Sequence, residues 1–263
     1  MKRNASAHLV LEALAPAQLV LSVAVAAEAD ASESLTIAQG GLPLPYREIV
    51  DQHGTRLQVA DVGPGQIEIS YDVEVVGQAS PAEVTAIDLV RYLRPSRYCE
   101  SDRLGPTARA EFAGLHGIEL LAGASSWVGQ RLRYVPGASL PTDGAVRTLL
   151  AREGVCRDYA HLVIALLRAL DVPARLVAVY APGLDPMDFH AVAEAYVEGA
   201  WHVVDATTLA PRQTLMRIAT GRDAADTAFL TTIGGAVNLL AMQVVAVADE
   251  LPRDDVRDLV QLR

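Results

Sequence analysis

A cysteine, a histidine and an aspartate in the second half of the chain have the types and spacing that covalent catalysis needs. Cys156 follows Gly154 and opens the run CRDYAHLVIALLRAL, whose apolar residues predict a buried helix over residues 156–170. A thiol at a helix N-terminus lies among N–H groups without an intrahelical partner, and these favour the thiolate, which is the nucleophilic form. The alternative is that Cys156 is only a small apolar residue at the start of a buried helix.

His190 favours the catalytic interpretation of that cysteine. It stands near the beginning of the predicted strand 188–197, directly after a turn-rich loop, where a general base is often placed. A lone histidine is also common as an ordinary surface or core residue. His161 is a nearer rival in sequence, but a residue five positions along a helix points about 140° away from Cys156.

Asp205 gives the pattern its third member. If Glu198-Gly199 forms a two-residue hairpin turn, Asp205 lies on the same strand face as His190, as a diagonal neighbour at roughly 7–8 Å. Its carboxylate can then accept the second ring N–H of the imidazole and fix the tautomer. A turn one residue longer would put Asp205 on the opposite face. In the assumed register His202 lies on that opposite face, and we expect it to be a bystander.

Two segments carry a resemblance to a known family, GVCRDYAHLVIALLRALDVPARLVAVY and DFHAVAEAYVEGAWHVVDAT. Together they resemble the core signature of bacterial transglutaminase-like proteins, which are often described as cysteine proteases. The resemblance implies a papain-like catalytic triad of Cys156, His190 and Asp205. The segments RPSRYCESDRL (94–104) and GRDAADTAF (221–229) resemble the same subgroup, which has an N-terminal β domain. The family often has Trp after the His-Ala pair, where this chain has Val192.

The elements around these residues predict an α+β protein with two domains. Residues 1–78 contain short apolar or alternating runs separated by turn-forming residues, which indicates an N-terminal β-sandwich-like domain. Residues 79–263 form the second domain, for which the resemblance implies a transglutaminase-like or papain-like core: a buried helix against an antiparallel sheet. Within it we expect two helices between residues 105 and 133, starting near Gly105-Pro106, and strands near 174–181, 228–233 and 237–247.

The charge and the motifs exclude several classes of partner. The 263 residues include 22 basic and 32 acidic side chains, for a formal charge of −10, and no basic cluster offsets the excess. Because such a surface repels phosphates, we expect no nucleic-acid partner and no membrane partner. The chain has no zinc-ligand spacing, no calcium loop and no glycine-rich phosphate-binding motif. We therefore expect neither a metal nor a cofactor.

The beginning of the chain bears on the compartment. Lys2 and Arg3 precede the apolar run 8–25, which loosely resembles a signal peptide. Glu12 and Pro16 interrupt that run, so we expect two short strands, 9–14 and 18–26, in a cytoplasmic protein.

The expected function is thiol-dependent acyl transfer on a peptide-type amide through a thioester acyl-enzyme, with a peptide or protein as substrate. Hydrolysis is expected over transamidation, because water is abundant and no amine-binding site is visible. The alternative is a catalytically silent transglutaminase-fold binding or scaffold protein. Tyr134 is a further candidate as an oxyanion donor, and Asp158 and Tyr159 as residues that touch substrate. Cys99, in a polar segment of mixed charge, is expected to be structural.

Overall fold

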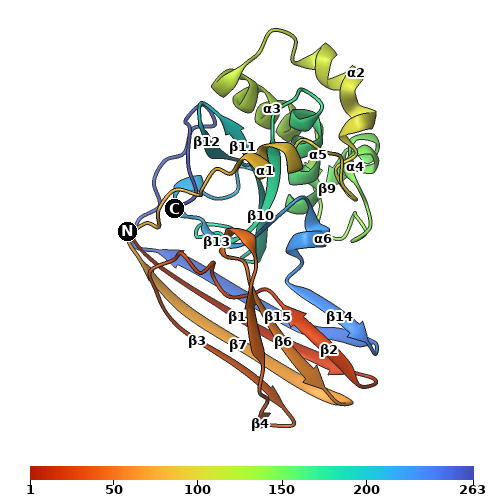
Figure 1. Cartoon of the computed structure of the whole chain (residues 1–263), viewed down its shortest axis with the longest axis vertical. Helices are drawn as coiled ribbons and strands as arrows, with labels where there is room; N and C mark the ends of the chain where they lie inside the picture. Colours follow the sequence, from red (N-terminus) through yellow and green to blue (C-terminus); the bar gives the residue numbers. More distant parts are fainter.

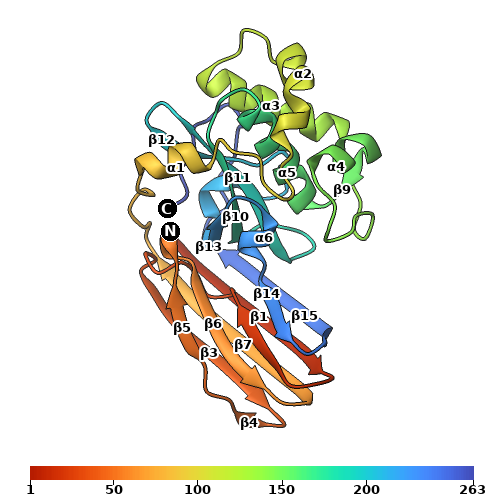
Figure 2. The same ribbon diagram turned by 45° about the vertical axis from the view of Figure 1, so that its right-hand side comes forward.

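The computed structural model describes all 263 residues and has two layers of strands below a mixed α/β part (Figures 1 and 2). One sheet has the order β15 (Val237–Ala248), β1 (Lys2–Ala13), β7 (Gly65–Val76), β3 (Ala31–Gln39), β4 (Leu42–Pro43). The other has the order β14 (Leu230–Gly234), β2 (Ala17–Leu21), β6 (Arg56–Val62), β5 (Arg47–Val50). A short 3₁₀ helix, η1 (Gln52–Gly54), joins β5 to β6.

Alternating side chains make these two sheets a sandwich. On β7, Ile67, Ile69 and Tyr71 are buried while Glu68 stays exposed, as the period-two pattern of the sequence predicts. Residues from both sheets form one apolar cluster between them. The two predicted N-terminal strands are present, and they lie in different sheets. The expected sandwich is therefore confirmed.

The C-terminal part of the chain returns to this sandwich. β15 pairs antiparallel with β1, and β14 pairs antiparallel with β2. The sandwich thus takes in residues 230–248, which the sequence analysis had placed with the second domain. The division at residue 78 remains a prediction about domains, but in space the β-rich part is built from both ends of the chain (Figure 1).

A third sheet positions two of the three catalytic candidates, His190 and Asp205. Its order is β12 (Ala200–Val204), β11 (Phe189–Val197), β10 (Ala174–Tyr180), β13 (Met216–Gly221), all antiparallel. Helices cover one face: α2 (Ser101–Glu111), α3 (Gly117–Arg131), α4 (Ala145–Ala151) and α5 (Cys156–Arg168). The remaining elements are α1 (Ala86–Arg91), β8 (Arg133–Tyr134), β9 (Glu153–Gly154), η2 (Arg212–Thr214) and α6 (Ala224–Thr227).

The central helix is α5, which lies between the third sheet and the other helices. It contacts β10 and β11 on one side and α2, α3 and α4 on the other, so nearly all of its residues are buried. A helix that is apolar all round needs such a position. Asp171 follows with a positive φ of 60°, and Pro173 stands two residues later, which ends the helix where the sequence predicted.

One predicted boundary is wrong. α2 begins at Ser101 and not near Gly105-Pro106, so Pro106 lies inside the helix. A proline there gives up one backbone hydrogen bond, while Leu104 and Ala108 of the same helix are both buried. The expected pair of helices is nevertheless present as α2 and α3. None of the helices is long and apolar enough to cross a membrane.

Candidate active site

The hairpin of β11 and β12 sets the position of the predicted base relative to its acidic partner. Val197 pairs with Ala200, so the turn consists of Glu198 and Gly199, as the sequence analysis assumed. Both turn residues have positive φ, 52° and 83°, which a type I′ hairpin turn requires. The assumed register is therefore confirmed, and Asp205 follows the last residue of β12 on the face of His190.

His190 and Asp205 form a buried hydrogen-bonded pair. Nε2 of His190 lies 2.8 Å from Oδ2 of Asp205, and both side chains are almost fully buried. The other carboxylate oxygen accepts the Thr207 N–H at 2.9 Å and the Thr207 hydroxyl at 2.7 Å. The carboxylate is thus held from two directions, which fixes the imidazole plane. Nδ1 of His190 has no hydrogen-bond partner and remains available.

The charges of the pair stabilise each other. Burial lowers the pKa of His190, but the Asp205 carboxylate, and after it the Cys156 thiol, outweigh burial and raise the pKa to about 10. Burial raises the pKa of Asp205, and His190 and Thr207 outweigh it, so that pKa lies below its ordinary value. Both shifts favour an imidazolium–carboxylate ion pair at neutral pH.

Cys156 is the first residue of α5, at the end where backbone N–H groups point outward. Its side chain is partly exposed, and it lines the same cavity as His190. The thiol lies close enough to contribute to the raised pKa of His190. The three residues predicted from the sequence are therefore brought together.

Tyr134, on β8, lies beside the same cysteine. Burial, followed by the charge of the Cys156 thiolate, raises the pKa of Tyr134 far above its ordinary value, while the Cys156 backbone N–H opposes that rise. The phenol is thus a neutral O–H donor near the sulfur. It also lies next to the backbone N–H of Cys156.

Asp158 has a structural role at the start of α5. Its carboxylate accepts the Val155 N–H at 2.8 Å and the Ser139 hydroxyl at 2.5 Å, and it is fully buried. Gly154 makes room for it, because a Cβ at that position would lie 2.7 Å from the Asp158 Cβ. Asp158 therefore fixes the first turn of the helix that carries Cys156, and does not touch the cavity.

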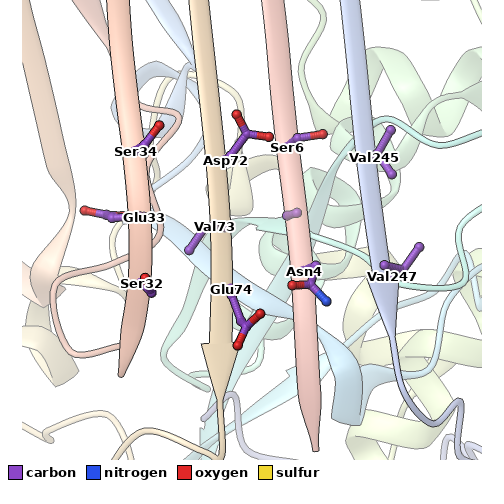
Figure 3. Close-up of a pocket in the computed structure, with 11 residues that line it drawn as sticks. Asn4, Ser6, Ser32, Glu33, Ser34, Asp72, Val73, Glu74, Val245 and Val247 are labelled. Atoms are coloured by element: carbon purple, nitrogen blue, oxygen red, sulfur yellow. The ribbon is translucent and has the colours of Figure 1, made fainter.

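The cavity beside these residues has a volume of about 540 Å³. Its walls are mostly apolar, and they come from α5, β10, β11, β13, the segment 224–231 and the sandwich residues Ser22 and Met242. A concave apolar site with a few converging polar groups is the usual form of a ligand-binding pocket. Another hollow, on the outer face of the five-stranded sheet (Figure 3), is lined by Asn4, Ser6, Asp72 and their neighbours and contains no cysteine or histidine.

The comparisons with known proteins agree with this geometry. Residues 116–206, which include all three residues of the site, match the family model of the transglutaminase-like superfamily. A candidate cysteine protease from Cytophaga hutchinsonii, solved by crystallography, is 31% identical with a TM-score of 0.88. The alignment covers 99% of this chain and 96% of that one. The chain belongs to the transglutaminase-like family. These similarities support a cysteine-dependent enzyme in general.

Curated relatives of this transglutaminase-like chain are similar over shorter segments. An uncharacterized protein of Mycobacterium leprae is 29% identical over 118 residues, which are 42% of this chain and 42% of that protein. An uncharacterized protein of Mycobacterium tuberculosis is 39% identical over 75 residues, 27% of this chain and 24% of that protein. The match thus spans less than half of the length of either relative.

His161 has a structural place in the transglutaminase-like core. Its Nε2 accepts the backbone N–H of Ala224 at 3.1 Å, and its ring stacks on Tyr98 with centroids 5.4 Å apart. Burial lowers its pKa to about 3, so the ring is neutral. His161 is therefore not the rival base, as the helical geometry indicated, and it anchors the segment that forms one wall of the cavity.

The other secondary candidates do not line the cavity. Cys99 is fully buried, and burial, partly offset by Arg168, raises the pKa of its thiol to about 12. His202 and Tyr159 are also buried and do not line the cavity. No group of three or more His, Cys, Asp or Glu side chains is arranged to hold a metal ion.

The aromatic residues that shape the cavity were not predicted from the sequence. Phe189 and Phe229 stack on each other with centroids 5.2 Å apart, and both line the cavity. Phe229 ends the segment GRDAADTAF, whose resemblance to the subgroup was the available signal. Nothing in that segment indicates that Phe229 packs against Phe189 of β11, 40 residues earlier, because the two residues come together only when the chain folds.

Proposed function

We propose that this protein is a thiol hydrolase that cleaves a peptide-type amide through a thioester acyl-enzyme. The hydrogen bond of 2.8 Å between His190 and Asp205, beside a thiol at the N-terminus of α5, carries the proposal. In this arrangement Cys156 is the nucleophile, His190 the acid and base, and Asp205 the group that orients the imidazole.

In the first half-reaction the Cys156 sulfur attacks the carbonyl carbon of the amide. The new C–S bond pushes the carbonyl electron pair onto oxygen, and the oxyanion accepts hydrogen bonds from the Cys156 N–H and the Tyr134 hydroxyl. The His190 imidazolium, paired with Asp205, gives its proton to the leaving nitrogen as the C–N bond breaks. An amine departs and a thioester remains.

In the second half-reaction the neutral His190 takes a proton from water while the water oxygen attacks the thioester carbon. The C–S bond breaks, the carboxylic acid leaves, and the thiolate with its imidazolium partner is restored. An amine in place of water gives transamidation by the same route. Hydrolysis is preferred in this proposal because the cavity holds no acidic side chain apart from Asp188 to bind a second, cationic amine.

Turnover of a peptide library tests the proposal. Wild-type protein and Cys156→Ala are incubated with the same library, and new amino termini are measured by mass spectrometry. We expect cleavage by the wild type and none by Cys156→Ala, whereas Cys99→Ala, which removes the other cysteine, retains it. Adding a primary amine and searching for amine-bearing products separates transamidation from hydrolysis.

The scaffold alternative makes the opposite prediction. If the fold only binds a partner, Cys156 reacts with iodoacetamide as slowly as an ordinary partly buried thiol, and His190→Ala leaves that rate unchanged. For an enzyme, labelling is fast near neutral pH and falls at least tenfold in His190→Ala. Slow labelling together with an uncleaved library would refute the hydrolase proposal.

A further inference from the structure

The cavity beside Cys156 has an apolar interior with an aromatic wall. Phe189 and Phe229 stack with an interplanar angle of 22°, and Leu176 and Ile218 also line the cavity. Phe189 and Phe229 are only partly buried, so part of this aromatic pair is accessible to a ligand. Stacked rings beside aliphatic side chains favour a large apolar group.

Apart from the catalytic residues, the cavity has two charged side chains, Arg157 and Asp188, each next in the chain or two positions from a catalytic residue. The Arg157 guanidinium is already bound to Ser139 and to Asp158. Asp188 accepts its neighbour's backbone N–H, and burial raises its pKa. Both groups are engaged within the protein, and apart from the catalytic residues the rest of the lining carries no charge. A charged side chain placed there would lose its hydration without compensation.

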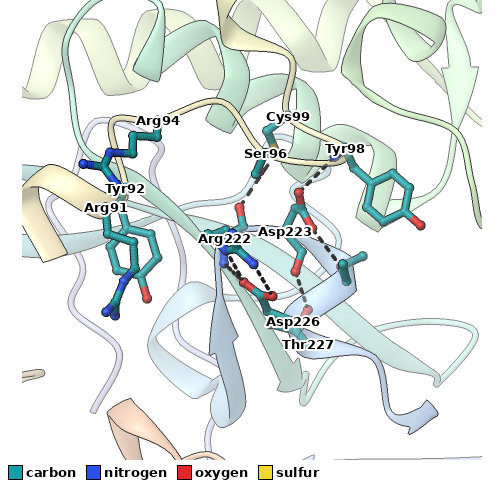
Figure 4. A network of polar contacts seen from close by, with 12 residues as sticks. Arg91, Tyr92, Arg94, Ser96, Tyr98, Cys99, Arg222, Asp223, Asp226 and Thr227 are labelled. Atoms are coloured by element: carbon teal, nitrogen blue, oxygen red, sulfur yellow. Dashed lines mark hydrogen bonds and ion pairs between the residues drawn. The ribbon is translucent and has the colours of Figure 1, made fainter. Parts of the chain in front are cut away.

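The wall that carries Phe229 is fixed to the helical part of the fold. Asp223 accepts the Tyr98 N–H at 2.9 Å and the Ala225 N–H at 2.9 Å (Figure 4). The Ala224 N–H donates to His161, which lies on α5. The segment 224–231 is therefore held to the helix that carries Cys156 before it enters the sandwich as β14. A wall held in this way has a fixed position relative to the sulfur.

We propose that this cavity binds a large apolar side chain, aromatic or branched aliphatic, of the residue next to the carbonyl that Cys156 attacks, and that Phe229 determines this specificity. The proposal rests on the proposed function, because it assumes an acyl donor at Cys156. The volume of about 540 Å³ is ample for such a side chain together with the neighbouring peptide backbone. The sandwich also contributes, since Met242 of β15 lines the cavity.

Peptidyl acyloxymethyl ketones that differ in one side chain test the proposal. Probes with Phe, Leu, Ala, Asp or Lys at that position are compared by their second-order rate constants of inactivation, and the modified residue is identified by mass spectrometry. The Phe and Leu probes are expected to label Cys156 about 10–100-fold faster than the Asp and Lys probes. Phe229→Ala is expected to reduce the preference for Phe over Ala about tenfold.

Two further variants make the result decisive. Ile233→Ala removes an apolar side chain of β14, the strand that begins directly after Phe229. Ile233 is 55% exposed and outside the cavity, so this variant should leave the preference unchanged. Met242→Glu, at a site that is 37% exposed, should slow the Phe probe and speed the Lys probe, a reversal that loss of folding cannot produce. Equal rates for Phe and Asp probes would overturn the specificity proposal and leave the hydrolase proposal standing. Failure of every probe to label Cys156 would instead refute the hydrolase proposal.

Discussion

Asp205→Asn perturbs the site at the point on which the catalytic interpretation depends. The amide has nearly the same shape and can still accept the Thr207 N–H, but it carries no charge. In the wild type the pKa of His190 is about 10, against an ordinary value of 6.5. The Asp205 carboxylate is the largest cause that raises it, and without that charge burial should bring the pKa below 6.5.

The magnitude follows from that difference. A change from about 10 to 6.5 corresponds to roughly 5 kcal/mol of stabilisation of the imidazolium, an upper value for a coupled buried pair. The substitution also favours the wrong imidazole tautomer, which in serine-protease triads lowers kcat by about 10⁴. We therefore expect kcat to fall by about 10²–10⁴ in Asp205→Asn.

NMR titration of the histidine rings is the assay, with the His190 signal assigned from its loss in His190→Gln. His190 should remain protonated well above pH 8 in the wild type and titrate below pH 6.5 in Asp205→Asn. Asp188→Asn is the matched control, because this carboxylate lies two residues from His190 without a hydrogen bond to it. Its effect on kcat should be less than tenfold. Titration of His190 near pH 6.5 in both the wild type and Asp205→Asn would refute the reasoning.

Three further predictions concern stability and the oxyanion. The raised pKa of His190 contributes stability to the folded protein that is complete below pH 6.5 and is lost as pH rises through about 10. The free energy of unfolding in urea should therefore be lower at pH 9.5 than at pH 6.5, by at most about 4 kcal/mol. This loss should be absent in Asp205→Asn. Tyr134→Phe should lower kcat about 100-fold with little change in KM, and an unchanged kcat would remove Tyr134 from the mechanism. Asp158→Ala should lower the free energy of unfolding by about 1–2 kcal/mol in urea titrations, because the Val155 N–H loses its acceptor. A change within about 0.5 kcal/mol, the ordinary range for surface substitutions, would contradict the capping role.

The parts of the site that local sequence determines were predictable. The helix from Cys156 follows from a continuous apolar run between Gly154 and Pro173. The hairpin register follows from a two-residue Glu-Gly turn, and a correct register places Asp205 on the same face as His190, as its diagonal neighbour. These features need no information from distant segments, because periodicity and turn chemistry specify them.

The parts that depend on long-range pairing were not predictable. Nothing in residues 230–248 indicates that they pair with β1 and β2, more than 200 residues earlier. The same holds for a buried ion-pair cluster beside the site. Glu194 lies between Arg175 and Arg217, and these two arginines outweigh burial and lower its pKa to about 2. Each partner comes from a different strand, so the cluster exists only once the sheet has formed.

Residues of the β-sandwich also form part of the candidate active site. Leu230 and Thr231 of β14 and Met242 of β15 line the cavity that also contains Cys156. A chain that ended before residue 230 would lose both this wall and two edge strands of the sheets. The return of the C-terminal strands therefore connects the stability of the sandwich to the shape of the substrate site.

Trapping of the acyl-enzyme tests the central claim most directly. The protein is mixed with an activated peptidyl ester, quenched in acid within milliseconds to seconds, and analysed by intact and peptide mass spectrometry. We predict one acyl group per chain, bound as a thioester at Cys156, which forms in Cys99→Ala and is absent in Cys156→Ala. Ester turnover without an acylated intermediate, or acylation that persists in Cys156→Ala, would contradict the account.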